Sequence, residues 1–281
     1  MIISASRRTD IPSYYSKWFM NRLREGFVLI QNPYNALRLS RLSLSPDTTD
    51  CIVFWTKNPA PMLDDLKTVS ESGYNYYFQY TITPYGKTWE SNLPPVENRL
   101  DTLYQLSDRI GKHRLVWRYD PVILDDTFSV QYHIEHFAFL CEKIQPCVDQ
   151  CIISFVDSYH HLHNTIPFIS DEQMRTIGKS FSEIAKGCSL ELATCSEKID
   201  LQEYGIKRAS CIDKERIEQI IGCPVKAKKD SGQRPECGCI ESVDIGAYGT
   251  CLNGCKYCYA TKSWPAAQKH FREHDAASPL L

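Results

Sequence analysis

Short apolar runs alternate with amphipathic stretches along almost the whole chain. Runs rich in β-branched and aromatic residues predict strands, and apolar residues that recur every three or four positions predict helices between them. The predicted strands lie at 2–6, 51–56, 75–83, 114–119, 151–156, 189–194, 205–210 and 241–246. The predicted helices lie at 10–26, 61–73, 96–110, around 134–141, and at 170–187, 213–222 and 264–273. Two further strands flank the turn residues 32–35 and predict a hairpin.

This alternation of strand and helix predicts the fold class. Strands separated by helices of this length form βαβ units, in which the strands pair in parallel and the crossovers are right-handed. Eight strand candidates besides the hairpin therefore predict an α/β fold, a parallel (β/α) barrel that is complete or partial. Neither an internal repeat nor a long linker interrupts the chain, so we expect one domain over residues 1–281.

A barrel of this kind predicts where the functional residues lie. Its working face is at the carboxyl ends of the strands, so a polar side chain that directly follows a strand is a site candidate. Five such residues are candidates for binding a cofactor: Arg7, Arg8, Lys57, Arg118 and Asp120. Their cations suit carboxylate or phosphate groups. Taken singly, each is explained more simply by a salt bridge at a strand end. Together with Asp10, Asp157 and Glu197 they form a set of four cations and four carboxylates that indicates a polar substrate.

Composition narrows the class of protein. The chain is 43% hydrophobic and 23% charged, with a formal net charge of −2, so no strong overall field attracts nucleic acid or anionic membranes. No apolar run approaches the roughly 20 residues of a membrane span, and the N-terminus lacks the pattern of a signal peptide. We therefore expect a cytoplasmic protein without a membrane partner. In a reducing compartment its 13 cysteines are expected to be buried or to bind metal rather than to form disulfides.

Three cysteines near the C-terminal end are the strongest chemical signal. Cys251, Cys255 and Cys258 stand in the stretch CLNGCKYCYA at a C-x3-C-x2-C spacing, after the last predicted strand. Chance alone would produce this spacing only about 0.03 times per chain of this composition. Thiolates suit zinc or an iron–sulfur cluster, and three of them leave the metal an open coordination position. An open position is typical of a catalytic site.

The same residues resemble the signature of the radical S-adenosylmethionine (SAM) superfamily, in which an aromatic residue, here Tyr257, precedes the third cysteine. The resemblance implies that Cys251, Cys255 and Cys258 hold a 4Fe–4S cluster whose open iron binds SAM. It also implies reductive cleavage of SAM to a 5′-deoxyadenosyl radical that abstracts hydrogen from a small-molecule or nucleotide-like substrate. A flavodoxin or ferredoxin-type protein would donate the electron. Members of the superfamily are complete or partial β/α barrels.

In that superfamily the motif follows the first strand, whereas here it follows the last. A circularly permuted barrel accounts for this order, since domain termini commonly lie close together. The segment 237–260, together with SASRRTDIP near the N-terminus, is similar to a permuted radical SAM family described only as a domain of unknown function, over essentially the whole chain. The shorter motifs FWTKNP and RYDP are similar to spore photoproduct lyase. The Gly-Gly-Glu strand end that commonly binds the methionine amino group is absent.

Four other cysteines form a candidate second site. Cys195 and Cys211 each follow a predicted strand, and Cys237 and Cys239 form a Cys-Gly-Cys motif before the last strand. Four thiolates could hold a second iron–sulfur cluster or a zinc ion. The C-x-C spacing is uncommon for a cluster, and the motif could lie at the opposite end of the sheet. His160, His161 and His163 also follow a strand, where exposed loop residues are a simpler interpretation than a metal site.

Two alternatives to a radical SAM enzyme of unknown substrate remain open. A DNA repair enzyme similar to photoproduct lyase predicts a basic strip beside the barrel mouth, which the net charge of −2 does not favour. A non-catalytic iron–sulfur or zinc protein predicts four protein ligands at the C-terminal site and no response of its metal to SAM.

Overall fold

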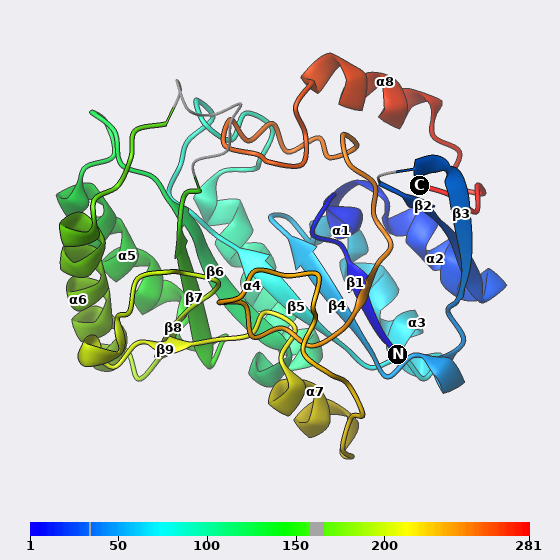
Figure 1. The fold of residues 1–281 in the computed structure, drawn as a ribbon, viewed down its shortest axis with the longest axis horizontal. Helices are drawn as coiled ribbons and strands as arrows, with labels where there is room; N and C mark the ends of the chain where they lie inside the picture. The colour runs from blue at the N-terminus through cyan, green and yellow to red at the C-terminus, as the bar shows by residue number, and fades with distance from the viewer. Residues whose placement is uncertain (34, 158–165) are drawn as a thin grey trace.

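The computed structural model describes residues 1–33, 35–157 and 166–281. Its central sheet contains β1 (Ile2–Ala5), β4 (Cys51–Thr56), β5 (Tyr76–Thr81), β6 (Leu115–Val122), β7 (Gln150–Phe155), β8 (Glu191–Thr194), β9 (Lys207–Arg208) and β10 (Val243–Asp244). The spatial order is β10-β1-β4-β5-β6-β7-β8-β9, and each neighbouring pair is parallel (Figure 1). The predicted α/β class with a parallel sheet is therefore confirmed.

A closed barrel is not observed in the described part of the chain. The sheet begins at β10 and ends at β9, and no strand pairing joins these two. Both strands are only two residues long, shorter than the stretches predicted at 205–210 and 241–246. A single backbone hydrogen bond, from Ile240 N to Ile212 O at 3.2 Å, connects the segments beside them. Two-residue strands offer too few amide groups to continue the ladder around a ring.

The helices occur in the predicted order. They are α1 (Ile11–Tyr14), α2 (Ser16–Glu25), α3 (Leu66–Glu71), α4 (Val96–Ile110), α5 (Val130–Ile144), α6 (Asp171–Gly187), α7 (Lys214–Ile221) and α8 (Trp264–Glu273), with short 3-10 segments at Pro46–Thr48, Ala60–Asp65, Lys112–Arg114 and Gln202–Tyr204. The predicted helix at 10–26 is divided at Tyr15, whose backbone leaves the helical region (φ −128°, ψ 24°). The one at 61–73 begins as a 3-10 helix that carries Pro61, which lacks an amide hydrogen.

The two faces of the sheet bury different residues. One face packs against α1 to α6, where Phe54, Trp117 and Ile153 of the strands meet Phe19, Phe137 and Phe181 of the helices. The opposite, inner face packs against α7 and the segment 225–240: Val53, Tyr77 and Val116 contact a cluster that includes Ile217, Cys237 and Cys239. The alternation of side chains along each strand separates these two cores. The inner face is therefore filled by the same segment that carries the Cys-Gly-Cys motif.

The last strand of the chain lies beside the first. Ile3 pairs with Val243 and Ser4 with Asp244, so the cysteine loop that follows β10 lies next to residues 6–10, which follow β1. The C-terminal tail continues past α8 to α2 and the hairpin, where Ser278 O accepts from Trp18 Nε1 at 2.9 Å (Figure 1). The two ends of the sequence thus form one structural region.

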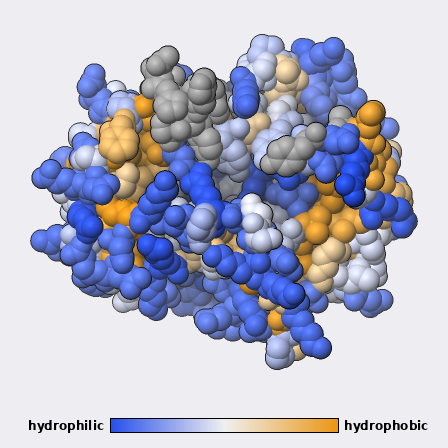
Figure 2. All heavy atoms as spheres, in the orientation of Figure 1, coloured by the Kyte–Doolittle hydropathy of each residue, from blue (hydrophilic) through white to orange (hydrophobic). Residues whose placement is uncertain are grey.

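The hairpin of β2 (Phe27–Asn32) and β3 (Asn35–Ser43) forms a separate two-stranded sheet, as predicted. Its outer face is unusually apolar, with Leu37 96% exposed and Leu39 51% exposed. Figure 2 shows a mainly hydrophilic face with hydrophobic side chains gathered on the side where this hairpin lies. No helix in the described residues has both the length and the apolar character to span a bilayer.

Candidate metal centre and its surroundings

Cys251, Cys255 and Cys258 line one cavity of about 390 Å³. All three keep part of their surface exposed, and Asn92, Lys256 and Trp264 are among the other lining residues. The described residues contain no group of three or more histidine, cysteine, aspartate or glutamate side chains arranged as metal ligands. Three sulfur donors facing one hollow nevertheless fit a group that needs three thiolates and free space beside them. We call these residues the triad.

Two of the triad thiols, Cys251 and Cys255, are protonated when no cation is near. Burial raises the pKa of Cys251 to about 12 and that of Cys255 well above the ordinary value of a thiol. Ligation to a metal requires the thiolate, so a bound cation would have to displace these protons.

The triad loop is anchored to the N-terminal segment by Asn253. Asp10 caps α1 by accepting from Ser13 N at 3.1 Å, and its other oxygen accepts from Asn253 Nδ2 at 2.9 Å and from Lys57 N at 2.8 Å. Tyr14 OH donates to Asn253 Oδ1 at 3.1 Å. Burial raises the pKa of Asp10, although these donors oppose the shift. One carboxylate therefore connects the ends of β1 and β4 to the triad loop.

The segment 88–92 holds the loop from the opposite side. Glu90 and Cys255 form an isolated antiparallel bridge, and Asn92 Nδ2 donates to Leu252 O at 2.8 Å. Gly254 has a φ of +69°, and a Cβ atom there would lie 2.1 Å from Ser91 Oγ. Glycine is the residue that tolerates both this conformation and this close approach. The contact explains why glycine stands between the first two triad cysteines.

Glu90 is the centre of a buried ionic network beside the triad. Its Oε1 accepts from Lys57 Nζ at 2.9 Å, from Thr83 Oγ1 at 2.9 Å and from Tyr257 OH, and its Oε2 lies 3.6 Å from Arg99 Nη1. Burial alone would raise the pKa of Glu90, but the positive charges of Lys57 and Arg99 hold it below its usual value. The network therefore fixes Tyr257, the aromatic residue of the motif, and gives Lys57 a structural partner.

Four of the five predicted cofactor-binding residues, Arg7, Lys57, Arg118 and Asp120, are linked by their contacts and charges. Lys57 lies beside the triad, and Arg8 stacks over Tyr248 at 5.1 Å from the ring centre. Arg7 and Arg118 approach the ring of Trp55, at 5.1 and 5.2 Å. Arg118 also pairs with Asp120, which accepts from Ser154 Oγ. The strand-end salt bridge expected for such residues is thus present for Lys57, Arg118 and Asp120, and cofactor binding by the five residues stays a prediction.

Arg7 and Arg118 border a second group of cysteines. Cys195 and Cys211 have their sulfur atoms 2.7 Å apart, and Arg118 Nη1 lies 2.8 Å from Cys211 Sγ. Cys239 interacts with both Cys211 and Cys237 through their side chains. The sequence therefore correctly grouped Cys195, Cys211, Cys237 and Cys239, although the segments that carry them are far apart along the chain. We call these four residues the tetrad.

The thiols of the tetrad differ in acidity. Hydrogen bonds from Cys211 and Cys237 lower the pKa of Cys239, and the charge of Arg7 contributes in the same direction. Burial raises the pKa of Cys211 well above its ordinary value. A proton shared among neighbouring sulfurs accounts for these opposite directions, since like charges in contact cannot all ionise.

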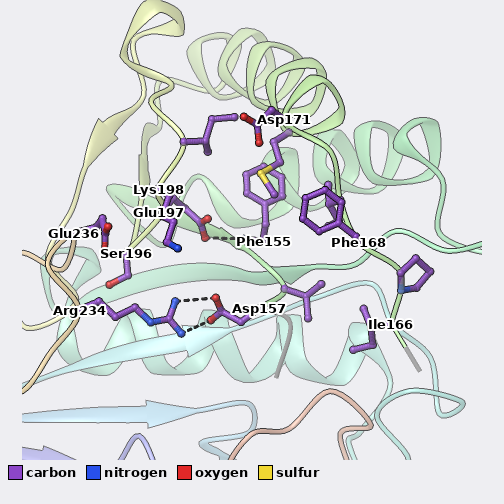
Figure 3. Close-up of a pocket in the computed structure, with 15 residues that line it drawn as sticks. Phe155, Asp157, Ile166, Phe168, Asp171, Ser196, Glu197, Lys198, Arg234 and Glu236 are labelled. Carbon is purple, nitrogen blue, oxygen red and sulfur yellow. Dashed lines mark hydrogen bonds and ion pairs between the residues drawn. The ribbon is translucent and has the colours of Figure 1, made fainter. Parts of the chain in front are cut away.

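A second cavity, of about 340 Å³, opens where β7 and β8 end (Figure 3). Arg234 and Asp157 form a two-point ion pair there, with N···O distances of 2.8 and 2.6 Å. Glu197 faces the same cavity and accepts from Phe155 N at 2.9 Å. Burial raises the pKa of Glu197 to about 8, and the charges of Asp157 and Asp120 add to this shift. The cavity offers a neutral carboxyl and an ion pair to a polar molecule.

Several important residues were not found from the sequence. Glu90 lies in an irregular stretch without apolar periodicity, where a carboxylate is normally exposed, and no sequence feature singled it out. Asp244, which accepts from Ser4 Oγ and Ser6 Oγ at 2.9 and 2.6 Å, and Trp55 lie within predicted strands and gave no separate signal. His160, His161 and His163 lie outside the described residues.

Comparison with known proteins identifies the family to which the chain belongs but does not identify a function. Neither the curated proteins nor the solved structures include a match to it. The family model described as a domain of unknown function, DUF1848, matches residues 2–260, a range that contains both the triad and the tetrad. The chain therefore belongs to the DUF1848 family.

Proposed function

We propose that this protein is a radical SAM enzyme that acts on a small polar substrate. The observation that carries the proposal is that Cys251, Cys255 and Cys258, at the C-x3-C-x2-C spacing, line a single cavity beside the carboxyl ends of parallel strands. When bound there, a 4Fe–4S cluster supplies one electron and an iron with an open position for the amino and carboxylate groups of SAM. The circularly permuted order of the barrel is part of this proposal.

The chain's own residues have three tasks in this account. Asp10 and Asn253 hold the triad loop against the N-terminal segment, and Glu90 holds Tyr257 from the other side. The ammonium group of Lys57 forms an ion pair with Glu90, which holds it in a fixed position beside the loop. Rigid support of this kind keeps ligands in place and excludes water from a reactive site.

The cavity at the ends of β7 and β8 is the proposed location for part of the substrate. Glu197, Asp157 and Arg234 present hydrogen-bonding groups of both kinds to it. Because the pKa of Glu197 is raised to about 8, its carboxyl is a hydrogen-bond donor at neutral pH. Such a lining suits a small molecule with polar groups better than an apolar one. An electron donor of the flavodoxin or ferredoxin type completes the proposal.

The test is the formation of 5′-deoxyadenosine and methionine from SAM. The full chain is reconstituted with iron and sulfide under anaerobic conditions, reduced with dithionite and incubated with SAM, and the products are measured by liquid chromatography. We expect both products from the wild type and from Cys223→Ser, a change of an exposed cysteine outside both groups. We expect neither from Cys255→Ala. A wild-type protein with a full cluster that leaves SAM intact would contradict the proposal and indicate a non-catalytic metal protein.

A further inference from the structure

The tetrad brings four thiols together from three separate stretches of chain. Cys195 follows β8, Cys211 follows β9, and Cys237 and Cys239 precede β10. The contacts run from Cys195 to Cys211, from Cys211 to Cys239 and from Cys239 to Cys237. Cys211, Cys237 and Cys239 are 2%, 4% and 1% exposed, so the sulfurs face the interior rather than solvent. Small buried hydrophobes would not require four adjacent cysteines at one point.

The surroundings fix the position of these sulfurs. Tyr77 OH and Gln79 Nε2, both from β5, donate to Cys211 O at 2.6 and 2.8 Å. Ile212 N donates to Cys239 Sγ at 3.3 Å, a contact that resembles those that support thiolate ligands. A Cβ atom at Gly238 would lie 2.5 Å from Ser210 Oγ, so the glycine between the two cysteines allows the motif to lie directly against the end of β9. The thiols are therefore held by a built framework.

Two guanidinium groups provide positive charge next to the sulfurs. Arg118 donates to Cys211 Sγ at 2.8 Å and also forms an ion pair with Asp120. Arg7 Nη2 is buried and has no hydrogen-bond partner in the described residues, and Cys239, Cys211, Cys237 and Asp244 lie close enough to Arg7 to interact with its charge. Burying four thiolates is costly unless positive charge compensates them. A divalent cation with four thiolates has a net charge of −2, which two arginines can offset.

The spacing of the sulfurs favours one ion over a cluster. Four sulfurs at about 2.3 Å from a tetrahedral zinc lie about 3.7 Å from one another. The Cys195–Cys211 pair, at 2.7 Å, would need to separate by only about 1 Å to reach that distance. A cubane cluster holds its four thiolates much farther apart because four irons lie between them. The compact tetrad thus fits a single small ion with much less rearrangement.

We propose that Cys195, Cys211, Cys237 and Cys239 bind one zinc ion on the inner face of the sheet. The ion would join the loop after β8, the end of β9 and the start of β10, where the sheet lacks a direct strand pairing. Its task is structural, because four protein ligands leave no open position for a substrate. The proposal does not depend on the function proposed for the triad.

The experiment counts zinc and iron in the full chain by plasma mass spectrometry after expression in medium that contains both metals. We expect one zinc per chain in the wild type and in a variant with all three triad cysteines changed to serine. We expect at least a tenfold loss of zinc in Cys211→Ser/Cys239→Ser. The matched control is Cys141→Ser/Cys188→Ser, which removes another pair of interacting cysteines outside both groups and is expected to keep the zinc of the tetrad.

X-ray absorption at the zinc edge separates ligation from general loss of folding. The wild-type spectrum is expected to show four sulfurs at about 2.3 Å, and Cys195→His to show three sulfurs and one nitrogen. Zinc that disappears with the triad, a 4Fe–4S cluster that survives in the triad variant, or a wild-type chain that contains a Cys195–Cys211 disulfide and no zinc would each overturn the proposal. None of these results depends on whether SAM is cleaved.

Discussion

The triad and the tetrad are both groups of cysteines, yet they are built in opposite ways. The triad comes from eight consecutive residues, and its sulfurs line an open cavity. The tetrad comes from three stretches of chain, and its sulfurs touch one another in the interior beside two arginines. An open cavity leaves room for a group larger than one ion and for a second molecule. Sulfurs in contact leave room for one ion.

This difference suggests a criterion for telling a reactive cysteine site from a structural one. The free space beside the sulfur atoms is more informative than the number of cysteines. The supports differ accordingly. Glu90, Asp10 and Asn253 position the triad backbone, whereas Arg118 and Ile212 N contact the tetrad sulfurs themselves. The following changes test this comparison, from the largest expected effect to the smallest.

Single cysteine changes should affect the two groups in opposite ways. In Cys255→Ala we expect 5′-deoxyadenosine formation to fall to background, while the free energy of unfolding of the metal-free chain changes by less than about 1 kcal/mol, since the side chain is partly exposed. In Cys211→Ala we expect a loss of about 2 kcal/mol of that free energy because the thiol is buried. Urea unfolding and the product assay measure the two effects. Equal losses of unfolding free energy in Cys255→Ala and Cys211→Ala would contradict the distinction between the triad and the tetrad.

The ionic network at Glu90 should contribute strongly to the stability of the folded chain around the triad. Glu90→Gln leaves the buried charges of Lys57 and Arg99 without their carboxylate, and we expect a loss of about 3–5 kcal/mol in the free energy of unfolding. Glu97→Gln, an exposed residue on α4, is the matched control and should change it by less than about 0.5 kcal/mol. The measurement is urea unfolding at pH 7. Similar values for the two variants would show that Glu90 is solvated and not a structural centre.

Glu197 should make stability depend on pH. Its pKa is about 8 in the folded chain, above the ordinary value of 4.5. The folded state therefore binds more protons than the unfolded state between these values, and stability falls as pH rises from 5 to 8. The free energy of unfolding should therefore fall less between pH 5 and pH 8 in Glu197→Gln than in the wild type, by about 2–3 kcal/mol.

Urea unfolding at pH 5, 6, 7 and 8 measures the slope for the wild type and for this variant. Glu172→Gln, which removes one exposed carboxylate from α6, is the control for a change of one charge. Parallel curves for the wild type and Glu197→Gln would contradict the buried, neutral carboxyl.

The smallest expected effect concerns the conformation of the triad loop. Gly254→Ala forces an alanine into a φ of +69° beside Ser91, and we expect it to cost about 1–2 kcal/mol and to reduce iron binding. Gly86→Ala, where a Cβ atom meets nothing within 4 Å, should be neutral in both measurements. Ser91→Gly combined with Gly254→Ala should recover the steric part of the cost only. Full recovery would mean that backbone conformation does not matter at this position.

Local patterns in the sequence were sufficient to predict the helices, most strands and the triad. The triad is visible because its three cysteines lie within eight residues, and α6 was predicted from a capping box, Ser170 with Gln173, that the structure contains. The parallel order of the strands followed from their alternation with helices. These features depend on residues close together in sequence.

Features that depend on distant residues were predicted less well. The strands β9 and β10 are shorter than the stretches predicted for them, and Cys211 and Cys239, which lie beside these strands, interact with each other. Glu90 is buried and Asp244 is partly buried, and both are held by charges or hydroxyls of residues that are distant in sequence. The tetrad was grouped correctly from strand positions, but its contact with Arg7 and Arg118 required the packed inner face.

The central claim is that the triad holds a 4Fe–4S cluster that binds SAM. It is tested most directly by the electron paramagnetic resonance spectrum of the reconstituted, dithionite-reduced chain, recorded before and after addition of SAM. We expect a reduced 4Fe–4S signal that changes when SAM is added, that is absent in Cys255→Ala and that persists in Cys211→Ser/Cys239→Ser. A signal that SAM leaves unchanged, or one that survives in Cys255→Ala, would contradict the account.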